Sequence, residues 1–352
     1  MQDVAKIDQN FAVASEISKP DAVFWDAEDK RFRIFGVFKE NGMYRRMPQA
    51  IAETASEGSA LLHQHTAGGR ICFKTNSPYV AISAKMNTIW RLPHFTLAGS
   101  AGFDMYVDGK YHASFIPVAK KLVDGFTSVK DLPGEGAHEV IINFPLYSGV
   151  TDLYIGLAEN SMTEPLNPYG NRKPVVFYGP SITQGACASR PGNSYPAVLS
   201  RRFGFDYINL GFSGRAKGEP AMAEYIANIP MSLFVYDYDG NAPDAEYLKK
   251  THKPMFDIIR AKQPDLPILM MSMPNLYRKD YDSRYAVIRE TYQTAVDSGD
   301  KNVYLIDGRD MVYSHDPDMM TVDNVHPNDF GFWCMAETVE NVLKEMKFGE
   351  NG

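Results

Sequence analysis

Short stretches in which hydrophobic and polar residues alternate fill the first half of the chain. Such alternation is typical of β-strands with one buried face. The Asp108-Gly109 pair between two of these stretches is a tight hairpin signal. We predict strands at 31–35, 71–74, 79–84, 103–107, 111–115, 138–144 and 153–157. Because no long helical stripe interrupts them, the pattern indicates an all-β sandwich or jelly roll.

The hydrophobic period changes near residue 165. Residues 160–174 carry three prolines and predict a linker. Beyond it, apolar runs at 175–178, 207–210, 233–236, 268–271 and 303–306 alternate with helical patterns at 195–203, 220–228, 245–261, 285–297 and 329–347. Such alternation predicts a parallel sheet covered by helices on both faces. We therefore expect a β-sandwich domain over 1–165 and an α/β domain over 172–352.

Length and composition agree with two globular domains. The chain has 352 residues, of which 44% are hydrophobic and 22% charged. The formal net charge of −7 argues against a nucleic-acid partner, which would favour a basic surface. No apolar run approaches the roughly 20 residues that a membrane-spanning helix needs. The N-terminus lacks the basic start and apolar stretch of a signal peptide, so we expect a cytosolic protein or a mature exported one.

Cysteines and histidines give no clear metal signal. Cys72, Cys187 and Cys334 cannot all pair and lack metal-binding spacing. Cys187 lies close to Ser181 and could be proposed as a nucleophile, but we expect a small buried residue. His63 and His65 would share one face of a strand, but a third ligand is missing. We expect surface histidines there, and neither a metal nor a cofactor.

Polar residues follow several predicted strands of the second half. A Gly-Pro-Ser block ends at Ser181, Gly214 and Asn241 follow the next two strands, and Asp323 and His326 precede the last helix. The carboxyl ends of parallel strands meet at one edge of the sheet, where sites form. Acyl transfer needs a nucleophilic alcohol, an imidazole base, an orienting carboxylate and donors for an oxyanion. The sequence therefore predicts a serine-hydrolase site at this edge.

Each of these residues also has a structural interpretation. Asp323 could cap the last helix, His326 could be an ordinary loop histidine, and Gly214 could permit a left-handed turn. Asp237 and Asp239 invite a metal hypothesis, but we expect solvated or hydrogen-bonded carboxylates. An α/β-hydrolase elbow is disfavoured, since a threonine stands where its second glycine should be.

Other residues could form the walls of the site. Arg190, Tyr277 and Arg278 lie in loops that could border the pocket, although we expect Arg190 to be a surface arginine. Phe332 and Trp333 are expected to pack the last helix.

Taken together, these blocks resemble the SGNH (GDSL-type) hydrolase superfamily, over residues 174–347. Its members carry a Gly-Asp-Ser block, a later glycine, a Gly-x-Asn block and a terminal Asp-x-x-His. The first half resembles the β-rich N-terminal domain of a bacterial subgroup with a Gly-x-Asp-Leu-Tyr signature. Residues 149–154, Gly-Val-Thr-Asp-Leu-Tyr, match that signature with one extra residue. The resemblance implies a flavodoxin-like, three-layer αβα fold for the second half.

The resemblance also implies roles. Ser181 would be the nucleophile, His326 the general base, and Asp323 the group that orients the imidazole. The N–H groups of Ser181 and Gly214 and the amide of Asn241 would form the oxyanion hole. Two departures stand out: a proline replaces the family's aspartate before the serine, and the aspartate that usually follows the asparagine is missing.

We therefore expect a serine esterase that hydrolyses small acyl esters, with carbohydrate O-acyl esters as one candidate class. A glycan-binding protein with a vestigial site, and a lipase or phospholipase, stay as alternatives. The expected partner is a small-molecule or glycan ester. We expect a periplasmic or secreted bacterial protein and leave the cytoplasm open.

Overall fold

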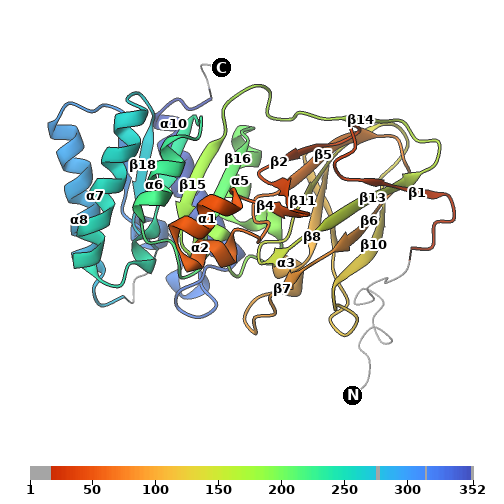
Figure 1. Ribbon diagram of the computed structural model, residues 1–352, viewed down its shortest axis with the longest axis horizontal. Coiled ribbons are helices and arrows are strands. Elements are labelled where there is room, and N and C mark those ends of the chain that lie inside the picture. The colour runs from red at the N-terminus through yellow and green to blue at the C-terminus, as the bar shows by residue number, and fades with distance from the viewer. Residues whose placement is uncertain (1–16, 275–277, 314, 350–352) are drawn as a thin grey trace.

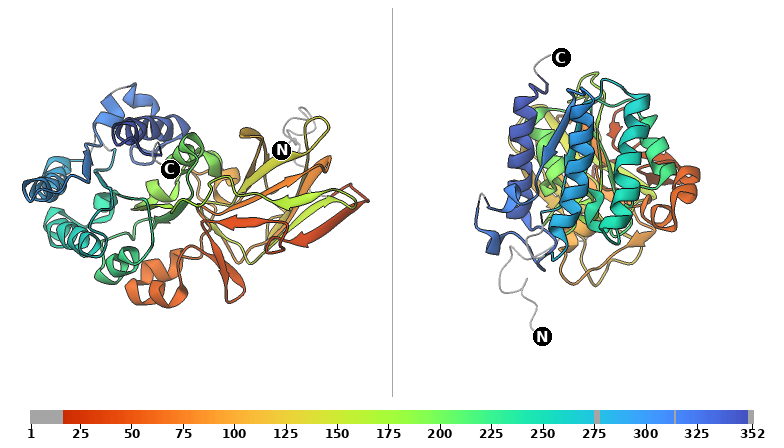
Figure 2. Two further views of the ribbon diagram at one scale, coloured as in Figure 1. Left: turned by 90° about the horizontal axis from the view of Figure 1, so that it is seen from above. Right: turned by 90° about the vertical axis from the view of Figure 1, so that its left-hand side faces the viewer.

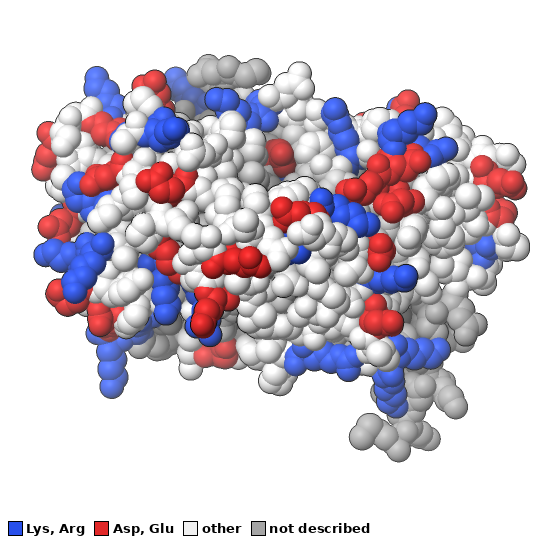
Figure 3. All heavy atoms as spheres, in the orientation of Figure 1, with Lys and Arg blue, Asp and Glu red and all other residues white. Residues whose placement is uncertain are grey.

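The computed structural model describes residues 17–274, 278–313 and 315–349. Figure 1 shows a β-rich half and a half in which helices surround a parallel sheet. Acidic and basic side chains are interspersed over both halves on the face shown in Figure 3. Among the described residues, no helix is both long enough and apolar enough to cross a membrane.

Two antiparallel sheets form the β-rich half. The first has the order β1 (Ala22–Asp26), β13 (Asp152–Ala158), β6 (Tyr79–Lys85), β10 (Gly125–Asp131). The second has the order β14 (Thr163–Pro165), β5 (Arg70–Thr75), β11 (His138–Asn143), β8 (Phe103–Val107), β9 (Lys110–Phe115), and β2 (Arg33–Phe35) also pairs with β5. Side chains of both sheets share one apolar core, as alternating strands require.

Each strand predicted for this half is present within two residues of its expected bounds. Asp108 and Gly109 both have positive φ in the β8–β9 turn, as a tight hairpin needs. Strands β1 and β10 were missed, and so were three helices, of which the longest are α1 (Gln49–Ala55) and α2 (Glu57–Leu62). These helices are too short for a helical period to emerge from the sequence.

Shorter elements complete this half. They are β3 (Phe38–Glu40), β4 (Met43–Arg45), β7 (Thr88–Ile89), α3 (Leu97–Ser100) and β12 (Ser148–Gly149).

The parallel sheet of the second half has the order β16 (Tyr207–Gly211), β15 (Val175–Gly179), β17 (Leu233–Tyr236), β18 (Ile268–Met271), β19 (Val303–Ile306). These strands agree with the apolar runs of the sequence to within one residue. In chain order the sheet runs 2-1-3-4-5, so the connections change direction around β15. Ligands bind at such a switch point in open α/β sheets, beyond the carboxyl ends of the strands.

Helices cover both faces of this sheet (Figures 1 and 2). Along β15, Val175 and Phe177 join one core cluster, whereas Val176 and Tyr178 join the other. The first cluster includes residues of α5 (Tyr195–Phe203) and α10 (Asp329–Glu345). The second includes residues of α6 (Pro220–Ala227), α7 (Ala245–Lys262) and α8 (Tyr281–Asp297). The short helix α9 (Asp310–Tyr313) follows β19.

The missed helices α1 and α2 belong to the second of these layers. Ala52 on α1 and Leu62 on α2 share a core cluster with Met222 and Ala223 on α6. The left view of Figure 2 shows α1 and α2 beside α6. The boundary near residue 165 stays a prediction, but the two halves share a hydrophobic core on this side.

Two buried arginines of the β-rich half cover the free edge of β16. Arg46, directly after β4, donates from Nη1 to the carbonyls of Asn209 (3.0 Å) and Gly211 (2.6 Å). Arg70 on β5 donates from Nη2 to the carbonyl of Tyr207 (3.1 Å). Both arginines are about 2% exposed. Alternate carbonyls of an edge strand point away from the sheet, so these donors satisfy groups that would otherwise be unpaired.

We predict that Arg46→Met destabilises the protein. Methionine fills a similar volume but leaves the carbonyls without a buried donor, which costs about 2–4 kcal/mol in total. Urea unfolding followed by fluorescence measures the change in free energy. Arg289→Met, at an exposed position on α8, is the control and should change it by less than about 0.5 kcal/mol. Equal stability of the two variants would show that Arg46 contributes nothing at this edge.

Candidate active site

Ser181 begins a short helix at the carboxyl end of β15. This helix, α4 (Ser181–Gln184), follows the strand after a single residue, Pro180. A side chain at Gly179 would place its Cβ 1.8 Å from Oδ1 of Asp237, so only glycine fits there. The tight connection leaves Ser181 8% exposed at the edge of the sheet.

The structure brings Ser181, His326 and Asp323 together. Ser181 Oγ lies 2.9 Å from His326 Nε2, and His326 Nδ1 lies 2.8 Å from Asp323 Oδ2. The other oxygen, Asp323 Oδ1, accepts from the backbone N–H groups of His326 (2.7 Å) and Val325 (3.1 Å). This loop leads into α10, whose N-cap is Asn328. Because only two residues separate them, Asp323 can accept hydrogen bonds from both the backbone and the ring of His326.

The charge state of Asp323 fixes the proton on the imidazole. Partial burial raises its pKa, but hydrogen bonds from the backbone and ring of His326 outweigh this effect and hold the pKa below its usual value. The group is thus a carboxylate near neutral pH and can only accept hydrogen bonds. Nδ1 of His326 therefore carries a proton, and in the neutral ring Nε2 presents its lone pair to the hydroxyl of Ser181.

Gly214 lies in the loop after β16, which is joined to the 3-10 helix η4 (Tyr238–Asn241) that ends at Asn241. Asn241 donates from Nδ2 to the carbonyl of Phe212 (3.0 Å), two residues before Gly214. The backbone N–H of Ser213 donates to Oε1 of Gln184 on α4 (3.1 Å). Gly214 has a φ of +67°, in the left-handed region that glycine adopts without strain. The segments that follow β15, β16 and β17 are therefore joined at one edge of the sheet.

A buried histidine supports α4 from the β-rich half. Gln184 donates from Nε2 to His65 Nδ1 and to the carbonyl of Leu146, both at 3.0 Å. Burial lowers the pKa of His65 to about 3, so the ring is neutral and accepts this hydrogen bond. The prediction of surface histidines is wrong, since His63 and His65 are 1% and 0% exposed. Both follow α2, whose packing against the α/β half gives no local pattern in the sequence.

Asp237 and Asp239 are buried and hydrogen-bonded. Asp237 accepts from Thr183 Oγ1 on α4 (2.6 Å), and Asp239 accepts from the backbone N–H of Met273 (3.0 Å). Burial is the main cause that raises the pKa of each to about 7. Asp237 therefore supports the helix that carries Ser181.

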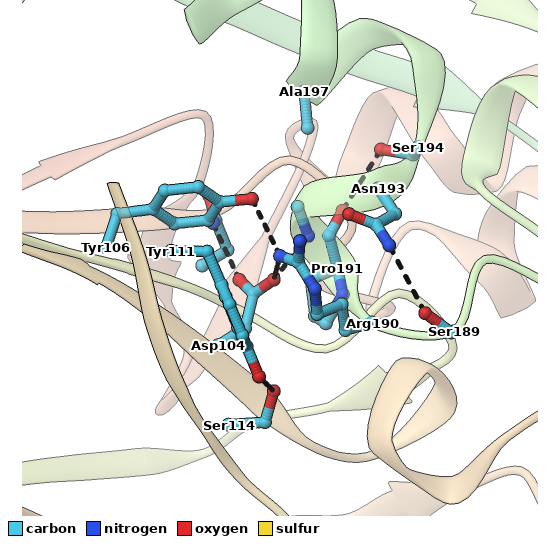
Figure 4. A network of polar contacts seen from close by, with 12 residues as sticks. Asp104, Tyr106, Tyr111, Ser114, Ser189, Arg190, Pro191, Asn193, Ser194 and Ala197 are labelled. Carbon is cyan, nitrogen blue, oxygen red and sulfur yellow. Dashed lines mark hydrogen bonds and ion pairs between the residues drawn. The ribbon is translucent and has the colours of Figure 1, made fainter. Parts of the chain in front are cut away.

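Arg190 connects the two halves (Figure 4). Its Nη1 donates to Oδ2 of Asp104 and to the hydroxyl of Tyr106, both at 2.7 Å. Its guanidinium carbon lies 3.9 Å from the ring centre of Tyr111. The prediction of a surface arginine is wrong because its partners come from β8 and β9, far away in the sequence. Asp104 is fully buried, so this arginine neutralises a charge that water cannot reach.

The loop that carries Arg190 also fixes the start of α10. Asp329, the first residue of that helix, accepts from the backbone N–H of Ser189 and from Asn193 Nδ2, both at 2.8 Å. The hydroxyl of Ser189 donates to the same carboxylate. Because Asp329 follows His326 by three residues, this network supports the position of the imidazole loop.

The remaining sequence candidates have mixed outcomes. Arg278 donates to the carbonyl of Gly240 (3.0 Å), next to Asn241, whereas Tyr277 lies outside the described residues. Phe332 is fully buried as expected. Trp333 also packs as expected, with its ring against those of Phe330 and His315, although it is 38% exposed. It follows Phe332 on α10 and therefore points away from the layer that Phe332 enters.

One group of side chains near the site could hold a metal ion. His94, Cys187 and His326 each offer a ligand atom, and these atoms lie within 4.8 Å of one another. Cys187 is 6% exposed, as expected, and burial raises its pKa to about 12, so it is a thiol rather than a nucleophilic thiolate. His94 was not singled out from the sequence, since a lone histidine in a loop carries no pattern.

Two family models match the chain. Residues 172–344 match the GDSL-like lipase/acylhydrolase family, and residues 22–163 match the GxDLY family, the N-terminal region of SGNH-hydrolase-type esterases. The chain belongs to the SGNH (GDSL-type) hydrolases. Membership in this family supports an esterase or hydrolase activity. A comparison with curated protein sequences gave no match.

Several solved structures resemble more than nine-tenths of the chain. A protein from Bacteroides ovatus named as a GDSL-like lipase has a TM-score of 0.81 at 29% identity, over 92% of this chain and 97% of that one. A salicylyl-acyltransferase from a tetracycline biosynthetic pathway has a TM-score of 0.78 at 19% identity, over 94% and 99%. A family two carbohydrate esterase from Clostridium thermocellum, in complex with cellohexaose, has a TM-score of 0.62 at 16% identity, over 92% and 99%. The last two likenesses concern the fold alone.

We predict that Asp237→Asn becomes more stable relative to the wild type as pH rises. The folded-state pKa of about 7 exceeds the ordinary aspartate value of 3.8, so between these values the folded protein keeps a proton that the unfolded chain has lost. Wild-type stability therefore falls with rising pH through this window. The unfolding free energy of the variant should rise relative to that of the wild type by about 4 kcal/mol between pH 4 and pH 8.

Urea unfolding at a series of pH values measures this difference. Asp318→Asn, which makes the same replacement at an exposed position, is the matched control. A flat profile for Asp237→Asn would mean that Asp237 is ionised in the folded protein throughout this range.

Proposed function

We propose that this protein is a serine esterase that hydrolyses small acyl esters through an acyl-enzyme on Ser181. The observation that carries the proposal is the chain of contacts from Ser181 Oγ through His326 to Asp323, at 2.9 and 2.8 Å. A hydroxyl is a weak nucleophile unless a base accepts its proton as it attacks. The lone pair of Nε2 faces that hydroxyl.

In the first step His326 accepts the proton of Ser181 while Oγ attacks the acyl carbon. Asp323 stabilises the imidazolium that forms and remains a carboxylate. His326 then donates the proton to the leaving alcohol. Water attacks the acyl-enzyme with the same imidazole as base, and Ser181 is restored.

The negative charge that develops on the acyl oxygen needs hydrogen-bond donors. We assign them to the N–H groups of Ser181 and Gly214 and to the side-chain amide of Asn241. Ser181 is the first residue of α4, so its N–H has no acceptor within the helix. Pro180 has no N–H, but the donor required belongs to the serine itself. The amide of Asn241 bonds to the Phe212 carbonyl through one of its two hydrogens, which leaves the other for the substrate.

We further propose a carbohydrate as the alcohol part of the ester. Similarity of fold to a carbohydrate esterase that binds cellohexaose supports this choice by analogy. The side chains of His326 and Asp323 are 23% and 33% exposed, so the leaving group can extend into solvent. A periplasmic or secreted location stays a sequence-based prediction.

Ser181→Ala and His326→Ala should each lower kcat for p-nitrophenyl acetate by at least about 10³-fold with the fold intact. Ser283→Ala, at an exposed position on α8, is the control and should keep wild-type turnover. The wild-type rate should fall from acetate to butyrate to octanoate if small acyl groups are preferred. Wild-type turnover by Ser181→Ala would refute the assignment of the nucleophile.

Asn241→Ala tests the oxyanion hole. Removing one donor that acts mainly in the transition state should lower kcat by about 10²-fold and leave KM nearly unchanged. Asn228→Ala, at an exposed position after α6, provides the comparison. A rise in KM with constant kcat would instead assign Asn241 to substrate binding.

A further inference from the structure

His94, Cys187 and His326 come from three separate parts of the chain. His94 lies in the loop between β7 and α3 of the β-rich half, Cys187 in the turn after α4, and His326 in the loop before α10. One ligand atom from each lies within 4.8 Å of the other two. His94 is exposed and Cys187 buried, so the group has a solvent-facing side and an inner side. A metal ion could therefore reach it from solvent.

The turn that carries Cys187 is unusual. Cys187 has a φ of +71°, a left-handed conformation that residues with a side chain adopt at a cost of about 1–3 kcal/mol. Two backbone hydrogen bonds fix the turn, from Ala186 to the Ser181 carbonyl (2.8 Å) and from Ala188 to the Gly185 carbonyl (3.2 Å). The thiol is thus presented by a constrained backbone rather than by a flexible loop.

The surroundings of the group favour a cation. His94 Nε2 lies 3.8 Å from Asp323 Oδ2, and the His94 and His326 ring centres are 5.7 Å apart. A thiolate together with the Asp323 carboxylate would balance the two charges of a divalent ion. Two imidazoles and one thiolate form a ligand set typical of zinc, with a water as the fourth ligand.

Distances decide how well such an ion fits. Bond lengths of about 2.05 Å to nitrogen and 2.3 Å to sulfur place tetrahedral donors roughly 3.3–3.6 Å apart. The ligand atoms of His94, Cys187 and His326 lie up to 4.8 Å apart, which is about 1 Å too far for a tetrahedral ion to contact all three. The His94 side chain is 37% exposed and can rotate to close this gap. We thus expect reversible binding rather than a structural zinc site.

We propose that His94, Cys187 and His326 form an inhibitory site for a divalent transition metal ion such as Zn²⁺. The Cys187 thiol releases its proton to water and binds as the thiolate. His326 gives one nitrogen lone pair to the metal and can no longer both accept the Ser181 proton and bond to Asp323. Binding stands on the geometry alone, whereas inhibition rests on the proposed esterase function.

Esterase assays over a chelator-buffered Zn²⁺ series test inhibition. Zn²⁺ should inhibit the wild type, and EDTA should restore its activity. Cys187→Ser and His94→Gln should keep basal activity within about twofold and raise the half-inhibiting concentration at least tenfold. Cys334→Ser and His112→Gln, which alter the same residue types elsewhere, should behave like the wild type. Equal sensitivity of Cys187→Ser and the wild type would overturn the site.

Direct binding separates the metal site from the esterase proposal. Co²⁺ added to Ser181→Ala should produce a thiolate-to-cobalt absorption band at one ion per chain, and Cys187→Ser should abolish it. Should this band appear in a protein whose wild type has no esterase activity, the metal site stands and the proposed function fails. Should the wild type hydrolyse esters without any band or inhibition, the metal site fails and the proposed function stands.

Discussion

The free edge of β16 is the constraint on which the rest of this structure depends. β16 is an outer strand of the parallel sheet, and its loop leads directly to Gly214. Arg46 and Arg70 donate to alternate carbonyls of that strand, and both arginines belong to the β-rich half. A guanidinium presents several donors in a rigid plane, so one side chain can satisfy two neighbouring carbonyls. The β-rich half thereby takes the place of a sixth strand.

The same half reaches the candidate site at two further places. His65 accepts from Gln184 on the helix of Ser181, and Asp104 pairs with Arg190 in the loop that supports α10. Each contact buries a polar group whose partner lies in the other half, so separating the halves would leave unpaired donors and charges. The geometry of the candidate site is thus a property of both halves, although Ser181, Asp323 and His326 all lie in one.

The sequence pattern was sufficient to predict a strand where several consecutive residues carry the same signal, such as an apolar run. The apolar runs predicted the parallel strands to within a residue, and the rule that their carboxyl ends share an edge predicted that Ser181 and His326 lie together. Single residues with distant partners were the failures. His65 and Arg190 were expected at the surface, because the residues next to them in the sequence give no sign of their distant partners, Gln184 and Asp104. Helices α1 and α2 were missed since each spans fewer than two full turns.

Synthesis proceeds from the N-terminus, and domains generally fold as units in that order. The strand with the exposed edge therefore leaves the ribosome after the segments that carry the two arginines. An edge of unpaired amides and carbonyls is a template for pairing with other chains. Here Arg46 and Arg70, which cover the edge, are synthesised before the edge strand β16. The order of the two halves along the chain therefore lowers the chance of aggregation during translation.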